Sequence, residues 1–299
     1  MDMTSRRSFI GGLAVVLTAP STLSAMAKAA TSLTKFDGLT PKIRRLEAKS
    51  GGRLGVACRI AGTTAQFGYR ENELFPMCST FKTLAAALIL HRVEGGIEQL
   101  DRSIKVPHNA VVASSPTTKN HAGGEMTVAQ LCEAAVTVSD NGAANLLLDS
   151  FGGPAQLTAY LRSIGDKVTR LDRIEPELNE SVPSDPRDTT SPLAMIDDYE
   201  RLALGDSLSQ KSRAQLVEWL VANKTGDDRI RTGLPKGWKC GDKTGTGDRG
   251  STNDAAVIWP ASGNPILMSV YLTGTKQSLA RRNAVIASVS RALVEAIEA

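Results

Sequence analysis

The chain has 299 residues, 41% of them hydrophobic and 4% aromatic, with a formal net charge of +4. This length and composition suffice for one large core or two coupled cores. Basic and acidic residues are interspersed, and no run of lysine and arginine is long enough for a nucleic-acid face, so nucleic-acid partners are not expected. The balance of charge fits a mildly basic exported protein.

Residues 1–29 are expected to be an export signal. Arg6 and Arg7 precede an apolar stretch (residues 9–19) and small residues of the kind that an export peptidase cleaves. The apolar stretch is shorter than the roughly 20 residues that span a bilayer, so no stable membrane anchor is predicted. The arginine pair followed by Ser8 and Phe9 favours the twin-arginine route over a general secretory signal. Either route predicts a periplasmic or secreted mature protein.

The cysteines and histidines do not form a metal-binding pattern. Cys58, Cys78, Cys132 and Cys240 include no C-x-x-C pair, and the three histidines add no ligand spacing. We therefore expect no metal and no other cofactor. The thiols are expected to be small buried hydrophobic groups, and the sequence leaves their pairing open.

Strand patterns occur at both ends of the chain and helix patterns between them. Residues 52–62 and 64–76 alternate apolar and polar side chains around a Gly-Thr-Thr turn, which predicts a β-hairpin. From Ser79 to about Val221 the periodicity is helical, apart from a long irregular stretch, Arg170–Thr190, that contains three prolines. A loop of that length in a compact domain is usually functional or disordered.

Three short β-rich segments follow, at residues 237–245, 251–260 and 265–274, and an amphipathic helix closes the chain at 280–299. The predicted fold class is α/β (α+β), with a five-stranded antiparallel sheet flanked by terminal helices and an all-helical domain. The sheet domain would comprise residues 30–70 and 222–299. The helical domain would comprise residues 71–221, including the irregular loop 170–190.

Ser79 and Lys82 stand three residues apart at the start of a predicted helix, so their side chains share one face. Free backbone N–H groups and the positive end of the helix dipole near Ser79 would stabilise a developing oxyanion. Lys82 is the only charged residue between Ser79 and His91, and desolvation would lower its pKa and make it a proton acceptor. A serine cap followed by a snorkelling lysine is the simpler alternative.

A second polar set, Ser139, Asp140 and Asn141, interrupts an apolar run just before a predicted helix. Helix capping explains part of this run but not three consecutive polar side chains.

A third set lies in the segment 242–250, "DKTGTGDRG", on a predicted edge strand. Lys243 and Thr244 would point to opposite faces, and Gly245 and Gly247 leave room for a ligand to approach the backbone. The segment also satisfies G-x-G-x-x-G, but a strand follows instead of the helix that a dinucleotide site requires, so we reject nucleotide binding.

Taken in order, Ser79-x-x-Lys82, Ser139-Asp140-Asn141 and Lys243-Thr244-Gly245 resemble the three motifs of the penicillin-recognising serine enzymes. This superfamily includes the class A β-lactamases and the penicillin-binding proteins. The resemblance covers nearly all of the mature chain and implies a β-lactamase/DD-peptidase-like fold. We expect a small-molecule β-lactam as the partner and a monomeric protein.

The segment 173–179, "RIEPELN", resembles the omega loop of class A β-lactamases, whose Glu and Asn hold the water that hydrolyses the acyl-enzyme. Glu175 would be that base and Asn179 the second anchor of the water, because an acylated serine stays trapped unless a base positions water against the ester. The resemblance also implies an Arg173–Asp188 pair across the neck of the loop and a cis peptide before Pro176. A solvated acidic loop is the alternative.

The resemblance assigns a role to each remaining motif residue. Ser79 is the nucleophile, and either Lys82 or Glu175, acting through water, takes its proton. The N–H groups of Ser79 and Thr246 form the oxyanion hole. Ser139 relays a proton to the lactam nitrogen and Asn141 binds the substrate's side-chain amide. The substrate carboxylate is held by Lys243, Thr244 and Thr246, next to Gly245, with Arg229 reaching over from a segment that also contains Arg231.

Three departures from the family bear on the substrate spectrum. Ser114 stands where many relatives carry an aromatic wall, which should loosen the hold on ligands. Cys78 is similar to carbapenem-hydrolysing relatives, in which it pairs with a second cysteine; Gly247 stands at that place here, so the bridge is expected to be absent, and Cys240 is a poor substitute. Thr246 and Asp248 favour cephalosporin-capable members.

The sequence therefore predicts a class A serine β-lactamase that opens the lactam ring of penicillins and cephalosporins and confers antibiotic resistance. Two alternatives remain open. A DD-peptidase or penicillin-binding protein would share the three motifs but lack Glu175 and Asn179. A non-hydrolysing β-lactam sensor domain would need a membrane anchor and would have no use for a deacylating loop.

Overall fold

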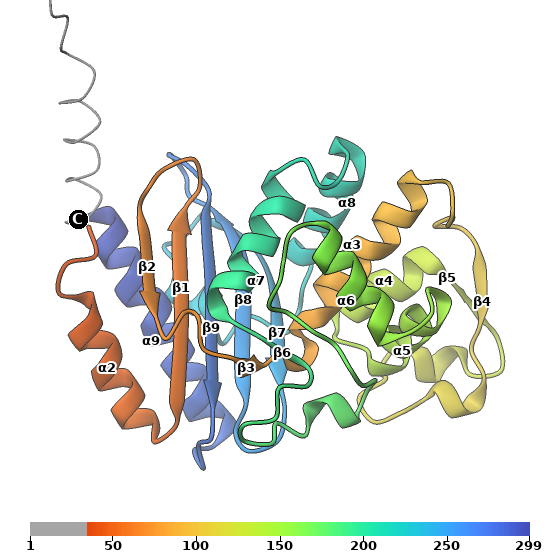
Figure 1. The fold of residues 1–299 in the computed structure, drawn as a ribbon, viewed down its shortest axis with the longest axis horizontal. Coiled ribbons are helices and arrows are strands. Elements are labelled where there is room, and N and C mark those ends of the chain that lie inside the picture. Colours follow the sequence, from red (N-terminus) through yellow and green to blue (C-terminus); the bar gives the residue numbers. More distant parts are fainter. Residues whose placement is uncertain (1–34) are drawn as a thin grey trace, which may run out of the picture.

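The five longest strands form one antiparallel sheet in the order β2-β1-β9-β8-β7 (Figure 1). A computed structural model describes residues 35–299, so the predicted export signal (1–29) lies outside the described part. The sheet combines β1 (Arg53–Ile60) and β2 (Gln66–Tyr69) with β7 (Lys239–Thr246), β8 (Thr252–Trp259) and β9 (Ile266–Thr273). The predicted five-stranded antiparallel sheet built from both ends of the chain is thus confirmed.

The positions of β1 and β7 in the sheet follow from their sequences. β1 is apolar on both faces from Leu54 to Cys58 and pairs along its whole length with β9, from Arg53↔Thr273 to Ile60↔Ile266. β7, which carries the Lys-Thr-Gly motif, pairs only with β8 among the sheet strands and forms one edge, as predicted. Its free side is therefore open to a ligand.

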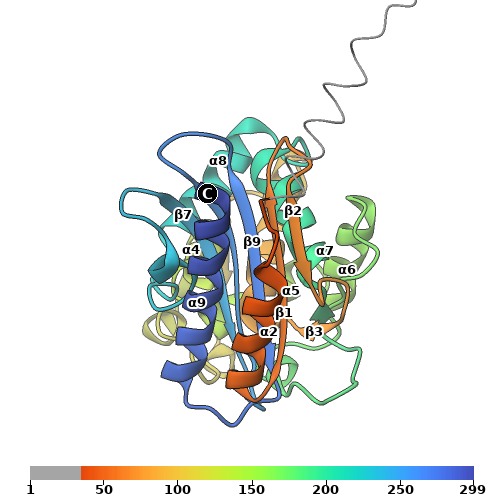
Figure 2. The ribbon, with the colours of Figure 1, turned by 90° about the vertical axis from the view of Figure 1, so that its left-hand side faces the viewer.

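Helices cover both faces of the sheet. α2 (Leu39–Ser50) and α9 (Leu279–Glu298) lie side by side on one face (Figure 2), where Ile43 and Leu293 pack with sheet residues such as Ile258 in one apolar cluster. α7 (Pro192–Tyr199) covers the other face and joins the sheet to the helical part of the molecule. The terminal helices are the flanking helices that the sequence predicts.

The helical part is built around α3 (Phe81–Glu94), in which every residue from Phe81 to Leu90 is buried. Lys82 therefore lies inside the core and does not snorkel to solvent. The neighbouring helices are α4 (Val128–Thr137), α5 (Asn141–Ser150), α6 (Pro154–Ser163) and α8 (Gln210–Val221). Short 3₁₀ turns occur at η1 (Cys78–Thr80), η2 (His108–Ala110), η3 (Thr118–His121), η4 (Glu177–Asn179) and η6 (Ile230–Gly233).

Some local structure was not predicted. Two short ladders pair β3 (Phe75–Pro76) with β6 (Thr189–Thr190) and β4 (Ser103–Lys105) with β5 (Glu125–Thr127). α7 continues as a π-helical turn, η5 (Glu200–Leu204), within the stretch for which the sequence predicts helical periodicity. These pieces are too short to produce a periodicity in the sequence. The domain boundaries at 70/71 and 221/222 stay a prediction.

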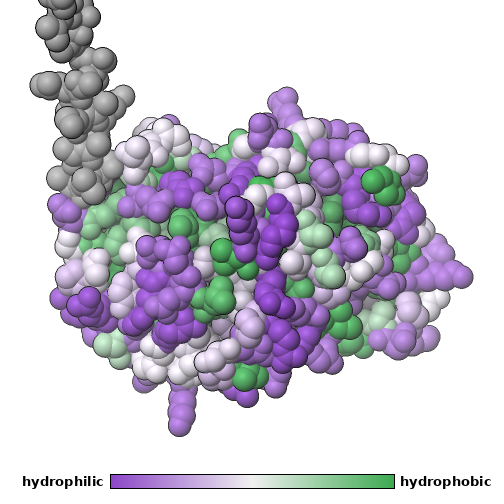
Figure 3. All heavy atoms as spheres, in the orientation of Figure 1, coloured by the Kyte–Doolittle hydropathy of each residue, from purple (hydrophilic) through white to green (hydrophobic). Residues whose placement is uncertain are grey.

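The surface in Figure 3 is mostly polar, with apolar side chains in small separate groups. Large apolar side chains that are exposed, such as Ile97 and Ile174, lie in separate loops of the chain. No helix in residues 35–299 is long and apolar enough to cross a membrane.

Candidate active site

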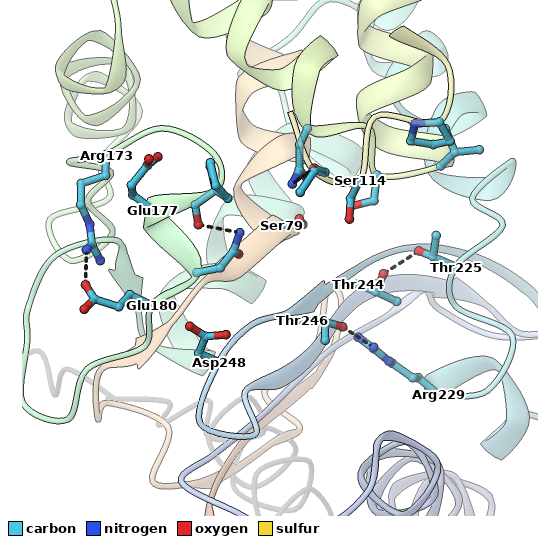
Figure 4. Close-up of a pocket in the computed structure, with 17 residues that line it drawn as sticks. Ser79, Ser114, Arg173, Glu177, Glu180, Thr225, Arg229, Thr244, Thr246 and Asp248 are labelled. Atoms are coloured by element: carbon cyan, nitrogen blue, oxygen red, sulfur yellow. Dashed lines mark hydrogen bonds and ion pairs between the residues drawn. The ribbon is translucent and has the colours of Figure 1, made fainter. Parts of the chain in front are cut away.

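A cleft of about 920 Å³ opens between β7, the helical part and the omega loop (residues 170–190) (Figure 4). Seven of the predicted site residues line it: Ser79, Ser139, Asn141, Asn179, Arg229, Thr244 and Thr246. Lys82, Glu175 and Lys243 are almost fully buried and reach the cleft residues through hydrogen bonds from behind. The structure thus brings together segments that are more than a hundred residues apart in the sequence.

Ser79 lies in the 3₁₀ turn η1, immediately before α3 begins. Its Oγ donates to Glu175 Oε1 at 3.2 Å, and Lys82 Nζ lies 3.0 Å from the same oxygen. Since the side chains of Lys82 and Glu175 are both 0% exposed, this ion pair is shielded from solvent and acts at low dielectric. A serine hydroxyl, a carboxylate and an ammonium group are therefore in direct contact.

Lys82 also binds the second motif. Its Nζ donates to Asn141 Oδ1 at 2.6 Å and to the carbonyl oxygen of Ser139 at 2.9 Å. Burial lowers the pKa of Lys82, although the charge of Glu175 opposes this effect. Lys82, which the sequence analysis identified, is thus buried and hydrogen-bonded between Glu175, the partner of Ser79, and the Ser-Asp-Asn segment.

The Ser139 hydroxyl oxygen accepts hydrogen bonds from two ammonium groups. Lys243 Nζ donates to Ser139 Oγ at 3.0 Å, and Lys82 Nζ lies 3.4 Å from the same oxygen. Burial lowers the pKa of Lys243 well below its usual value, and the nearby charge of Lys82 adds to this. Because both lysines donate to its lone pairs, the Ser139 hydroxyl is left to direct its own proton toward the cleft.

Asp140 explains why three polar residues stand together in this segment. It is the N-cap of α5, and its Oδ1 accepts from the N–H of Ala143 at 2.8 Å. Its Oδ2 accepts from the N–H groups of Thr117 and Thr118 at 2.7 and 2.8 Å. Asp140 therefore fixes a neighbouring cleft loop and the helix start, while Ser139 and Asn141 face the site.

Glu175 is held from both sides. The Asn179 side chain donates to Glu175 Oε2 and, at 3.2 Å, to the carbonyl of Pro176. Asn145, which the sequence analysis missed, accepts from the Glu175 N–H at 2.9 Å and donates to the Glu175 carbonyl at 2.8 Å. The available signal was its position four residues after Asn141 on α5, on the same helix face.

The neck of the omega loop contains the expected ion pair. Arg173 Nε lies 2.6 Å from Asp188 Oδ2, and the Asp188 side chain is 1% exposed. Asp188 Oδ1 also accepts from the N–H groups of Asp172 and Arg173. The Glu175–Pro176 peptide is cis, as the resemblance implies.

The two nearby arginines have different partners. The Arg229 guanidinium donates to the carbonyls of Gly245 and Asn253 at 2.8 and 2.7 Å and to Thr246 Oγ1 at 2.7 Å, so it lies at the cleft wall (Figure 4). Arg231 turns away from the cleft and pairs with Asp242 at 2.5 Å. The sequence analysis favoured Arg229 as the substrate-binding arginine. Only the structure shows which of the two arginines reaches the cleft.

The β7 side of the cleft holds one more residue that the sequence analysis missed. The hydroxyls of Thr225 and Thr244 lie 2.5 Å apart, and both side chains line the cleft. The sequence gives no signal for Thr225, which stands alone between Lys224 and Gly226.

The glycines and Cys78 show how closely β7 approaches the nucleophile. A Cβ on Gly245 would lie 2.7 Å from the carbonyl oxygen of Met77, and a Cβ on Gly247 would lie 2.7 Å from Cys78 Sγ. Only glycine fits such contacts. All four cysteines are free and buried in the structure, and Cys240 forms no bridge with Cys78.

The described residues contain no group of three or more His, Cys, Asp or Glu side chains that could hold a metal ion.

The fold and these contacts together define a penicillin-recognising serine enzyme. Residues 38–297 match the model of the β-lactamase enzyme family. The chain is 44% identical to β-lactamase Toho-1 from Escherichia coli over 276 residues, which are 92% of this chain and 95% of that protein. It is also 44% identical to β-lactamase OXY-2 from Klebsiella oxytoca, over 87% of this chain and 90% of that protein.

A solved structure of an ancestral (GNCA) class A β-lactamase superposes with a TM-score of 0.85 at 59% identity, covering 86% of this chain and 99% of the other. The chain therefore belongs to the β-lactamase enzyme family and is a class A serine β-lactamase.

Proposed function

We propose that the enzyme hydrolyses penicillins and cephalosporins through an acyl-enzyme on Ser79, which water activated by Glu175 then cleaves. The observation that carries this proposal is the position of Glu175. Its carboxylate accepts from Ser79 Oγ at 3.2 Å, pairs with Lys82 at 3.0 Å and receives a hydrogen bond from Asn179. A base in contact with the nucleophile serves both halves of such a reaction.

In acylation, Ser79 Oγ attacks the lactam carbonyl carbon and loses its proton. Glu175 is the acceptor that the geometry favours, directly or through water, because Ser79 Oγ already donates to it, whereas the Lys82 ammonium is directed at four other oxygens, on Ser139, Asn141 and Glu175. Lys82 stabilises the carboxylate and orients Ser139 and Asn141. The N–H groups of Ser79 and Thr246 bind the oxyanion, each such donor typically contributing about 3 kcal/mol to the lowering of the barrier.

The carbon–nitrogen bond of the lactam then breaks, and the nitrogen receives the proton of Ser139. Two ammonium groups donate to Ser139 Oγ, and they lower the cost of the developing negative charge on this oxygen. Lys82 can return a proton to Ser139 and take one from the protonated Glu175, whose Oε1 lies 3.0 Å from Lys82 Nζ, so that Glu175 is ionised again before deacylation.

The substrate carboxylate is bound beside β7, and the substrate's side-chain amide beside Asn141. The carboxylate site consists of Lys243, Thr244, Thr246 and Arg229. Gly245 has no side chain, so the substrate can approach the backbone of β7 there. The bond from Arg229 to Thr246 Oγ1 at 2.7 Å supports this assignment. Arg229 is buried, so its charge is screened little by solvent.

In deacylation, Glu175 takes a proton from water, the water oxygen attacks the Ser79 ester, and the ester oxygen leaves with a proton to restore the hydroxyl. Asn179 supports this step. No donor among the described residues reaches its buried Oδ1, while its Nδ2 is engaged with Glu175. Asn179 Oδ1 can therefore accept one hydrogen of the water while Glu175 accepts the other.

The two alternative functions are disfavoured by the same residues. A DD-peptidase has no need for Glu175 and Asn179 beside its nucleophile. In a non-hydrolysing sensor, these two residues would promote hydrolysis of the acyl group that the sensor must keep. We further propose export to the periplasm or the medium, where the enzyme would protect cells from β-lactams, and a monomeric state, supported by the scattered exposed apolar side chains.

The decisive experiment is Glu175→Ala mixed with a penicillin and examined by intact mass. We expect a persistent adduct of one penicillin on Ser79, and no adduct on a Ser79→Ala control. Turnover by Glu175→Ala at the wild-type rate would refute the assignment of the base. A long-lived adduct on the wild-type enzyme would favour the peptidase or the sensor.

A further inference from the structure

A chain of hydrogen bonds runs from the cleft into the protein interior. Thr244, which lines the cleft, lies with its hydroxyl oxygen 2.5 Å from that of Thr225. The Thr225 hydroxyl oxygen lies 2.8 Å from Asn223 Oδ1, and Asn223 Nδ2 donates to Asp242 Oδ2 at 2.8 Å. The chain therefore connects a residue of the proposed carboxylate site to a side chain that is 0% exposed, that of Asp242.

The interior end of the chain holds the Asn223 amide in one orientation. Asp242 also accepts from Arg231 Nε at 2.5 Å, and Arg231 in turn donates to two carbonyls at the end of α8. Asn223 Oδ1 accepts from the Thr225 N–H at 3.0 Å. Because an N–H group can only donate, this atom is the amide oxygen, which has no proton of its own.

The direction of each hydrogen bond follows from the number of protons. The contact between Thr225 and Asn223 joins two oxygens, and only the Thr225 oxygen carries a proton. A hydroxyl group has a single proton, so the 2.5 Å contact between the two threonines must contain the proton of Thr244. Thr244 therefore donates to Thr225, and in this arrangement its hydroxyl has no proton to offer to the cleft.

Thr246, two residues further along β7, is arranged in the opposite way. Its hydroxyl oxygen accepts from Arg229 at 2.7 Å, so its own proton stays available for a substrate carboxylate. Both threonines line the cleft from the same face of the strand. Their hydrogen bonds, and not their positions, make Thr246 a donor to the cleft and Thr244 an acceptor.

We propose that binding of the substrate carboxylate reverses this relay of Thr244, Thr225 and Asn223. Thr244 turns its proton to the carboxylate, and Thr225 turns its proton from Asn223 to Thr244. Thr225 is thus a positioning residue that acts through Thr244. The direction of the relay in the free enzyme is independent of the reaction, whereas its reversal rests on the carboxylate site of the proposed function.

The reversal exchanges hydrogen bonds without leaving a buried group unpaired. Asn223 Oδ1 loses the Thr225 hydroxyl but keeps the Thr225 N–H at 3.0 Å. Thr244 gains a hydrogen bond to an ionised carboxylate, which is roughly twice as strong as one between neutral groups. The bond that Thr244 then accepts from Thr225 polarises its hydroxyl further, since linked hydrogen bonds strengthen one another. Thr225 should therefore tighten the binding of a carboxylate and leave the chemical steps unchanged.

Neutron diffraction from deuterium-exchanged crystals tests both directions of the relay. In the free wild-type enzyme, we expect the deuterium of Thr244 on the line to Thr225 and that of Thr225 on the line to Asn223. In crystals of Ser79→Ala soaked with benzylpenicillin, both should be reversed, and this complex requires no step at Glu175.

Each departure from these positions has a definite meaning. A Thr244 deuterium directed at the cleft in the free enzyme overturns the relay. A Thr244 deuterium that still points to Thr225 beside a carboxylate bound at β7 overturns the reversal alone. A carboxylate bound away from β7 overturns the proposed carboxylate site and the reversal together.

Steady-state kinetics test the positioning role of Thr225. Thr225→Val keeps the shape of the side chain and should raise the KM for benzylpenicillin about threefold with kcat unchanged, and Thr225→Ser should restore the wild-type KM. The methyl ester of the same penicillin has no carboxylate, so its KM should not change. The matched control is Thr232→Val, whose hydroxyl binds the Asp227 carbonyl outside the cleft and which should match wild type. An unchanged KM for benzylpenicillin in Thr225→Val, or an equal rise with the ester, refutes the role.

Discussion

At the scale of single residues, the site is made of charges that ordinary core packing would exclude. Lys82, Glu175 and Lys243 are buried almost completely, and buried charges destabilise a fold unless they are paired and hydrogen-bonded. Lys82 meets this condition through Glu175 and Asn141, but no carboxylate lies within salt-bridge distance of Lys243 in the described part of the chain. Buried ionisable groups of this kind are typical of catalytic sites, which agrees with the proposed mechanism.

Asn145 is the residue whose replacement tests this positioning most directly. Asn145→Ala removes both hydrogen bonds to the backbone of Glu175, and losing one buried bond typically costs about 1–3 kcal/mol. We expect deacylation to slow by roughly tenfold or more, since about 1.4 kcal/mol corresponds to tenfold in rate. The rate of deacylation is measured by burst kinetics with a chromogenic cephalosporin.

The matched control for this experiment is Asn264→Ala, in the exposed turn between β8 and β9. It should leave both the burst and the steady state unchanged. A variant Asn145→Ala that deacylates at the wild-type rate would show that Asn179 and the loop neck hold Glu175 without help.

The motif residues could be predicted from sequence because their chemistry is concentrated in short segments. Ser79 and Lys82 share a helix face, and Lys243 and Thr244 lie on one strand, so spacing alone places each pair. Asn145 shares a helix face with Asn141, but this spacing does not show what its side chain binds, and Thr225 has no such signal. Their partners are backbone atoms of the omega loop and a hydroxyl on β7, and only the folded chain brings those into reach.

At the scale of elements, α2 is fastened to the β1–β2 hairpin through one carboxylate. Glu47 accepts from the Leu54 N–H at 3.0 Å, from Tyr69 Oη at 2.6 Å and from Arg70 Nε at 2.8 Å. Burial alone would raise the pKa of Glu47, but the bonds from Arg70, Leu54 and Tyr69 outweigh it and hold the pKa below its usual value. One side chain thus joins a terminal helix to both strands of the predicted hairpin.

This contact predicts an acid-sensitive contribution to stability. A carboxylate with a lowered folded pKa stabilises above its unfolded pKa of about 4.3, and this contribution is lost as the pH falls through the folded pKa. Glu47→Gln should therefore lower the free energy of unfolding by about 1–2 kcal/mol at pH 7. The gap should close toward pH 3 in urea titrations, whereas Glu125→Gln, on the exposed start of β5, should match wild type at every pH.

At the scale of the whole molecule, the sheet and the helical part share one core. A single apolar cluster contains sheet residues such as Val257 and Leu267 together with helix residues such as Leu84 and Leu147. The sequence indicated the two parts by their different periodicities, but it could not show this common packing, because the contacts join β8 and β9 to α7 and β8 to the turn η1, which lie far from these strands in the sequence.

A shared core predicts that the two parts unfold together. Leu267→Ala truncates a fully buried side chain on β9 and should cost about 2–5 kcal/mol through lost burial and the cavity left behind. In a urea titration followed by NMR, amides of α3 and of β8 should show coincident midpoints, both shifted equally by the substitution. Ile97→Ala, at a position 68% exposed, should shift neither. If the α3 midpoint stayed at its wild-type value while that of β8 fell, the sheet and the helical part would be separate folding units, and the cleft between them could open without global unfolding.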